Sequence, residues 1–111
     1  MIMEQLRNYR AIKKEHRHLE QRLRTLERRP DSEEDILRPL RECYEKQLAD
    51  LVTIELTVEQ AITKLTPLER HLVRLRYIEG LPWHRVAVKI QYSEVQAKRI
   101  GRRVLHKLER Q

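Results

Sequence analysis

The sequence predicts an all-α protein in which a long helical hairpin precedes a compact unit of three shorter helices. The composition favours helix over strand, because the 111 residues include only two glycines and four prolines and are rich in Leu, Glu, Lys, Arg and Gln. Apolar residues recur at spacings of three and four along the first 65 residues, as in an amphipathic helix. Residues 83 to 102 contain two further short helical patterns joined by a turn. We therefore expect two domains, over residues 1–65 and 66–111.

The first predicted helix covers residues 2 to 26. Its seam alternates by three and four over about four heptads, at Ile2, Gln5, Tyr9, Ile12, His16, Leu19, Leu23 and Leu26. Pro30, followed by Asp31, is expected to end it, because proline lacks the amide hydrogen and disfavours helical geometry in the preceding residue.

The second predicted helix covers residues 33 to 65, with Ser32 as its cap. Its seam again alternates by three and four, at Leu37, Leu40, Tyr44, Gln47, Leu51, Ile54, Val58, Ala61 and Leu65. Pro39 leaves two alternatives open, a short first turn that breaks and a continuous helix with a kink.

The two long helices carry opposite charges. Residues 1–29 hold nine basic and four acidic side chains, whereas residues 31–65 hold four basic and nine acidic side chains. This difference favours antiparallel pairing through the short connection between them. Because two helices alone bury only a ribbon of apolar surface, we also expect a homodimer or a higher homo-oligomer.

A third helix is predicted over residues 66 to 80. Thr66 is a helix cap, Pro67 suits the first helical position, and Glu69 completes a capping box. Leu68, Leu72, Leu75 and Ile78 form its buried stripe. Gly80 is expected to end the helix in a left-handed conformation.

The last two helices form a helix-turn-helix layout within residues 83 to 102. Ser93 is expected to cap the second helix, which runs to about Leu108, and Gly101 suggests a close helix crossing or a slight bend. Trp83 is expected to pack on the small core. The residues expected to hold the two helices together are Val86, Ala87, Ile90, Tyr92, Ala97 and Ile100.

All of the net charge of +7 lies in residues 66–111, which hold eleven Lys and Arg against four Asp and Glu. A local excess of positive charge is what phosphate binding requires, and the second helix of such a layout enters a DNA major groove. We therefore expect this helix to bind double-stranded DNA. The expected base contacts are Glu94, Val95, Gln96, Lys98 and Arg99, and the expected phosphate contacts are Ser93, Arg102, Arg103 and Lys107.

Residues 65 to 108 resemble region 4 of bacterial sigma factors and, more closely, the small sigma-region-4-like regulators of phages and prophages. The matching positions are Leu75, Arg76, Tyr77, Gly80, Val86, Ala87, Ser93, Arg103 and Leu108. The resemblance implies a helix-turn-helix that binds DNA, but not independent initiation of transcription. The chain departs from the family at Gln91, where glycine is common in the turn, and at Ala97, where a larger aliphatic residue is usual.

Other classes of site have little support. The five histidines form no helical i, i+4 metal pair, Ser32 and Ser93 are better explained as caps than as nucleophiles, and no glycine-rich phosphate loop occurs. We expect no enzymatic activity, no metal and no cofactor. Without a membrane-length apolar run or a signal-peptide pattern, a cytoplasmic protein that does not bind membranes is expected. Cys43 is the single cysteine, and we expect it to be partly buried.

Three functions remain open. The first is a sequence-specific double-stranded DNA-binding transcriptional regulator encoded by a phage or prophage. The second is a recognition subunit for phage DNA packaging, similar to a small terminase, which also combines a helix-turn-helix with oligomerising helices. The third is a helical protein-interaction module whose basic surface docks on RNA polymerase without reading DNA.

Overall fold

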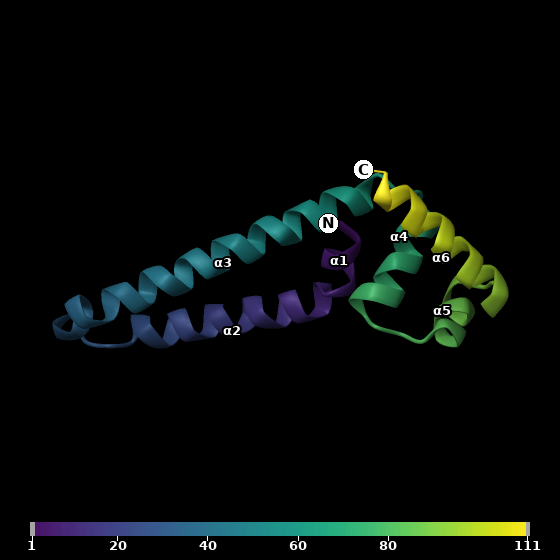
Figure 1. Ribbon diagram of the computed structural model, residues 1–111. Coiled ribbons are helices and arrows are strands. Elements are labelled where there is room, and N and C mark those ends of the chain that lie inside the picture. Colours follow the sequence, from purple (N-terminus) through teal and green to yellow (C-terminus); the bar gives the residue numbers. More distant parts are fainter. Residues whose placement is uncertain (1, 111) are drawn as a thin grey trace. The chain divides into compact units, whose positions relative to one another are not determined.

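The computed structural model describes residues 2–110, and the chain is 86% helical with no strand in that range (Figure 1). This confirms the predicted all-α class. In chain order the elements are α1 (Ile2–Arg7), α2 (Tyr9–Glu27), the 3-10 turn η1 (Asp31–Glu33), α3 (Glu34–Thr63), α4 (Pro67–Val73), the π-helical turn η2 (Arg74–Ile78), α5 (Trp83–Ile90) and α6 (Glu94–Glu109). Within residues 2–110, no helix combines the length and the apolar character needed to cross a bilayer.

The chain divides into two compact units. The helix-turn-helix unit comprises the residues up to Arg10 together with those from Leu56 onward, and the hairpin unit comprises Ala11–Glu55. The packing thus groups α1 and the end of α3 with the C-terminal helices, whereas the sequence predicted a boundary at residue 65.

One apolar core holds the helix-turn-helix unit together. Its buried residues are Leu6, Tyr9, Val58, Ala61, Ile62, Leu65, Leu72, Val73, Leu75, Val86, Ala87, Ile90, Ala97, Ile100, Val104 and Leu108. The stripe predicted for the third helix is confirmed at Leu72 and Leu75, which are buried, and Leu68 and Ile78 pack against them at the edge. Every helix of the unit therefore contributes its apolar face to the same cluster.

The predicted long first helix is interrupted at Asn8, which lies in a turn between α1 and α2. Two neighbouring residues, Leu6 and Tyr9, are 1% and 0% exposed and belong to the common core, and α1 packs against α6. Asparagine favours a break, because its short side chain competes for backbone hydrogen bonds. The prediction of one uninterrupted helix was wrong because it took no account of α6.

Helix α3 is continuous across Pro39, which excludes the alternative of a short first turn that breaks. Pro39 lies only five residues after the first residue of α3, so its missing amide hydrogen removes one bond near the helix start. The preceding 3-10 turn contains Ser32, and it shows no side-chain cap. The expected role of Ser32 as the cap of this helix is therefore not observed.

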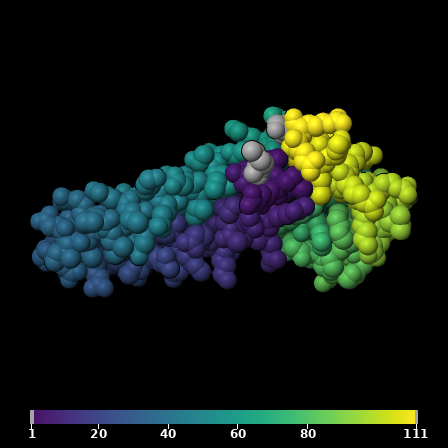
Figure 2. Space-filling view, in the orientation of Figure 1, coloured from purple at the N-terminus to yellow at the C-terminus, as the bar shows by residue number. Residues whose placement is uncertain are grey.

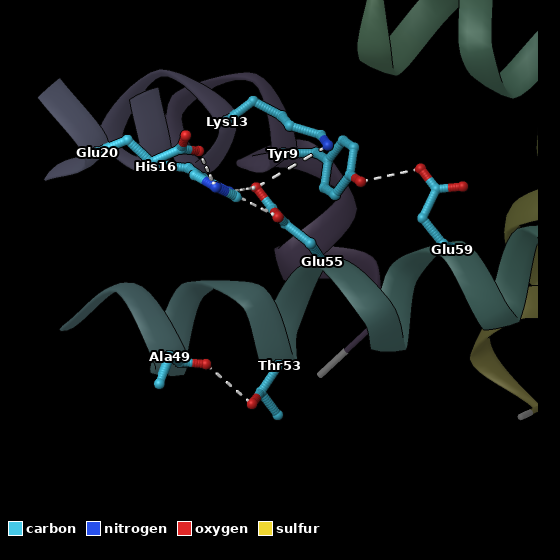
Figure 3. A network of polar contacts seen from close by, with 8 residues as sticks. All are labelled: Tyr9, Lys13, His16, Glu20, Ala49, Thr53, Glu55 and Glu59. Atoms are coloured by element: carbon cyan, nitrogen blue, oxygen red, sulfur yellow. Dashed lines mark hydrogen bonds and ion pairs between the residues drawn. The ribbon is translucent and has the colours of Figure 1, made fainter. Parts of the chain in front are cut away.

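The hairpin unit pairs α2 with α3 in antiparallel directions (Figure 1) and has a thin interior. Among residues 11–55 only Leu19, Leu26 and Glu55 are buried. His16 Nδ1 donates to both carboxylate oxygens of Glu55, at 2.9 and 2.8 Å (Figure 3). Its Nε2 lies against a carboxylate oxygen of Glu20. The predicted seam thus includes a polar layer where apolar packing would otherwise be expected.

Two residues of the hairpin are more exposed than predicted. Leu40 is 41% exposed, and Cys43 is an exposed free cysteine. The predictions that Leu40 lies in the seam and that Cys43 is partly buried are therefore wrong, because α2 covers only one side of α3.

The third helix begins and ends as predicted, with one difference. Thr66 Oγ1 accepts from Glu69 N at 3.3 Å, and Thr66 N donates to Glu69 Oε1 at 3.0 Å, which is the expected capping box. The last turn widens to π-helical geometry at η2, where Glu79 N donates to Arg74 O. Gly80 then adopts a φ of +73°, and Leu81 N donates back to Leu75 O, which closes the helix.

Helices α5 and α6 cross closely at Gly101, as the sequence suggested. A Cβ atom at Gly101 would lie 2.4 Å from Cη2 of Trp83. The Trp83 ring packs against the core, and the guanidinium carbon of Arg76 lies 4.9 Å from the centre of that ring. The indole therefore occupies the space that a larger residue at position 101 would need.

Gly101→Ala should lower the free energy of unfolding. Overpacking costs about 1–3 kcal/mol, whereas alanine gains about 1 kcal/mol in helix propensity, so we expect a net loss of up to about 2 kcal/mol in urea unfolding. The same change in a Trp83→Leu background should be neutral or stabilising. An equal loss in both backgrounds would show that the indole does not set the requirement for glycine.

Candidate nucleic-acid interface

Helix α6 starts at a second capping box. Ser93 Oγ accepts from Gln96 N at 3.1 Å, and Ser93 N donates to Gln96 Oε1 at 3.0 Å. The predicted cap is confirmed: the Ser93 side chain accepts from the backbone of Gln96, and the Gln96 side chain accepts in return from the backbone of Ser93. Both residues were also expected to contact DNA, so the cap fixes the orientation of two candidate contacts.

The turn between α5 and α6 depends on Gln91, which has a φ of 63° and a ψ of 42° in the left-handed region. The chain thus keeps the turn without the glycine that is common there, and Tyr92 N donates to Ala87 O at 3.0 Å. Tyr92 is 43% exposed, which corrects its predicted place between the helices. The left-handed residue turns the chain away from the buried face of α5 before Tyr92 is reached.

One face of α6 is buried and the opposite face is open to solvent. The buried residues of α6 are Ala97, Ile100, Gly101, Val104 and Leu108. At about 100° per residue, the positions that point most directly away from this face are Val95, Arg99, Arg102 and His106. All nine residues predicted to contact DNA are exposed. Atoms of α5 and α6 form much of the visible surface at the C-terminal end (Figure 2).

Intramolecular ion pairs engage the two flanks of this open face. On one flank, Lys98 Nζ lies 3.3 Å from Glu94 Oε1. On the other, Lys107 Nζ donates to both carboxylate oxygens of Glu69, at 2.9 and 2.8 Å, and Arg103 Nε lies 3.8 Å from Glu69. Of the nine predicted residues, only Val95, Arg99 and Arg102 have no side-chain hydrogen bond or ion pair within residues 2–110.

Glu69 explains why Lys107 is held. The Glu69 side chain is 2% exposed, and a buried carboxylate needs both a counter-charge and hydrogen-bond donors. Burial raises the pKa of Glu69, but the hydrogen bonds from Lys107 and Thr66 outweigh it and hold the pKa below its ordinary value. The sequence identified Glu69 only as part of a cap and gave no sign of its partner 38 residues away.

Two basic residues of α5 lie outside the DNA contacts predicted from the sequence. Arg85 and Lys89 are exposed, and no side-chain hydrogen bond or ion pair engages them in the described part of the chain. Each directly precedes a buried residue of α5, Val86 or Ile90, so it lies about 100° around the helix from that residue, on the flank of the buried face. Among the described residues, no three His, Cys, Asp or Glu side chains form a group that could hold a metal ion.

Acid should destabilise the helix-turn-helix unit through Glu69. Because the folded pKa is lowered, this stabilisation is present above the unfolded pKa of about 4.3 and is lost as the pH falls through the folded value. Urea unfolding from about pH 7 to about pH 3 should show a smaller loss of stability for Glu69→Gln than for the unmodified chain. Glu79→Gln, at an exposed carboxylate, should keep the full dependence. An undiminished dependence in Glu69→Gln would contradict this role.

A comparison with protein-family models matches residues 61–110 to region 4 of sigma-70, a DNA-binding domain family that is not typically enzymatic. The matched range includes the end of α3, the capped α4, the turn η2 and all of α5 and α6. No curated protein and no solved structure matches the chain. The match agrees with the capped recognition helix and its open face, and it implies DNA as a partner. Residues 61–110 therefore form a sigma region 4-like helix-turn-helix domain.

Proposed function

We propose that the protein is a sequence-specific double-stranded DNA-binding transcriptional regulator. The observation that carries this proposal is the row formed by Val95, Arg99 and Arg102. Their side chains are exposed and have no polar partner within residues 2–110, and they lie between the first turn and the middle of α6, while the opposite side of the helix is packed in the core. The N-terminal part of a recognition helix is the part that meets base edges.

The proposed contacts follow from position along α6. Arginine donates two hydrogen bonds to guanine, and valine suits the methyl group of thymine, so Arg99 and Val95 are the leading base contacts. The flanking base contacts proposed from the sequence are Glu94, Gln96 and Lys98. The proposed phosphate contacts are Ser93, Arg102, Arg103 and Lys107, to which the structure adds Arg85 and Lys89 as further candidates.

The charge available for phosphate contact is not uniform along the helix. Arg103 and Lys107 both lie near the buried Glu69, so a phosphate would compete with that carboxylate for them. Arg102 has no such partner within the described residues. Arg102 is therefore the better probe of phosphate binding, because a change at Lys107 would also alter folding stability.

We also propose a division of labour in the chain, with residues 66–111 binding DNA and residues 1–65 joining chains into a homodimer or higher homo-oligomer. The support is the thin interior of the hairpin unit, where three residues among 11–55 are buried. The proposal of phage or prophage origin rests only on the resemblance of the sequence to small regulators of that kind.

Two alternative functions predict different experimental results. A recognition subunit for DNA packaging would form a closed ring of many subunits, whereas a regulator would be a small oligomer. A module that docks on RNA polymerase would use the same basic residues against acidic protein, and it would fail to bind random duplex at micromolar concentration and moderate salt.

Arg99→Ala should weaken binding to a site selected from a random DNA pool by about 1–3 kcal/mol, with a smaller effect on random duplex. Arg102→Ala should weaken binding to both DNAs by similar factors, because phosphates carry no sequence information. Fluorescence titration at a fixed salt concentration measures both effects. Arg38→Ala, at an exposed arginine of the hairpin, is the control and should change neither affinity. If Arg99→Ala and Arg102→Ala reduce both affinities equally, base reading by Arg99 is refuted.

A further inference from the structure

The outer side of α2 carries a row of basic and polar side chains within the hairpin unit. The row follows spacings of three, four and three residues and consists of Lys14, Arg17, Gln21 and Arg24. At about 100° per residue, all four lie within about 40° of one line that runs opposite the buried Leu19. All four are exposed, and we call them the α2 basic row. At about 1.5 Å per residue, the row is about 15 Å long.

Few carboxylates offset the positive charge of the row. The carboxylates of α2 all lie about 80° or more around the helix from the line of the row. Glu20 is the nearest of them, and one of its oxygens lies against His16 Nε2 (Figure 3), while the other lies 3.8 Å from Arg24 Nη1. The row ends before the tip of the hairpin, where residues 27–35 hold two arginines and five carboxylates. The excess of positive charge is therefore confined to one side of α2.

The cations of the row are available to a partner. Lys14 and Arg17 make no side-chain hydrogen bond or ion pair within residues 2–110. In the same range, Arg24 has only its contact with Glu20, in which the two side chains are 59% and 42% exposed. An exposed ion pair of this kind contributes little to folding stability. Folding therefore does not require cations at these positions.

We propose that the α2 basic row is a second DNA-contacting surface, which binds the phosphates of a duplex without regard to base sequence. Each DNA strand carries one phosphate per about 3.4 Å along the axis, so a row about 15 Å long spans about four phosphates. Lysine and arginine bind phosphate through charge and hydrogen bonds, and such contacts need no pocket. This inference rests on the DNA binding proposed above and assigns part of that binding to the hairpin unit.

A second copy of the chain fits the row less well than DNA does. The negative charge of α3 in the hairpin unit comes from the six carboxylates of residues 34–55. Four of the six already have partners within the chain, which are Arg41 for Glu34, Arg38 for Asp35, Lys46 for Asp50 and His16 for the buried Glu55. A partner subunit would thus offer few unpaired carboxylates, whereas a DNA strand offers a phosphate at every nucleotide. Charge complementarity favours DNA.

The double variant Lys14→Gln/Arg17→Gln should weaken binding to random duplex at least about 10-fold at about 0.1 M salt. Each phosphate contact contributes about 0.9 to the slope of log K against log salt, so the slope should become shallower by up to about 1.8. Arg38→Gln/Lys46→Gln removes the same charge from exposed ion pairs of α3 and is the matched control, which should leave affinity and slope unchanged. An unchanged slope in the first variant, or an equal loss in both, would overturn the proposal.

The same titrations separate this inference from the proposed function. Failure of the unmodified chain to bind any duplex at micromolar concentration would refute DNA binding itself. A loss of affinity in Arg102→Ala but none in Lys14→Gln/Arg17→Gln would refute only the second surface. Sedimentation equilibrium without DNA should give the same mass for this double variant as for the unmodified chain. A lower mass would assign the row to contact with a second copy and overturn its assignment to DNA.

A cleavage reagent attached to the row tests whether the row lies against DNA. In the Cys43→Ser background, which removes the exposed native cysteine, iron–EDTA coupled to Gln21→Cys should cut the backbone of a bound duplex. The control is the same reagent at Ala49→Cys, an exposed position of α3 on the side away from α2 (Figure 3). Cleavage from position 21 that does not exceed cleavage from position 49 would contradict the proposal.

Discussion

The buried carboxylate of Glu69 is the interaction on which the helix-turn-helix unit depends. A carboxylate that is 2% exposed needs donors on every side, and Glu69 obtains them from Thr66 at the start of α4 and from Lys107 near the end of α6. The pair thereby joins a helix start to a helix 38 residues further along the chain. It also removes Lys107 from the charge that is freely available at the surface. The excess of positive charge in this half of the chain is thus partly structural, and the freely available part lies at Arg99, Arg102 and the exposed residues of α5.

The hairpin unit also contains a buried carboxylate, but few apolar residues are buried around it. His16 and Glu55 form its polar layer, and Lys13 Nζ lies 4.0 Å from the same carboxylate (Figure 3). A hydrogen-bonded layer gives less stabilisation than apolar packing of the same area, but it favours one register of the two helices. Because few apolar residues are buried around this layer, the hairpin gains from any surface that covers its exposed side. Apolar side chains of the hairpin, such as Ile36, are exposed because the two helices cover only part of each other's surface.

Local signals were sufficient to predict where the C-terminal helices begin and end. Thr66, Ser93 and Gly80 act within one helical turn, so their effect can be read from neighbouring residues alone. The break at Asn8 requires the packing of α1 against α6 in addition to the local preference of asparagine, and the exposure of Tyr92 depends on the left-handed Gln91. The candidate DNA-contacting residues were all found on the exposed face because helical periodicity separates inside from outside. Which of these side chains form ion pairs within the protein could not be predicted, because some of the partners, such as Glu69 for Lys107, lie far away in the sequence.

Helix α6 keeps the residues that stabilise it apart from those proposed to read DNA. Its inner face needs small side chains, because Ala97 is fully buried and the Trp83 ring fills the space beside Gly101. Its outer face, at Val95, Arg99 and Arg102, makes no polar contact within residues 2–110 that folding would require. A substitution on the outer face therefore costs little stability, whereas one on the inner face disturbs a close-packed crossing. This separation lets the same scaffold present a different set of base contacts without a change in its core.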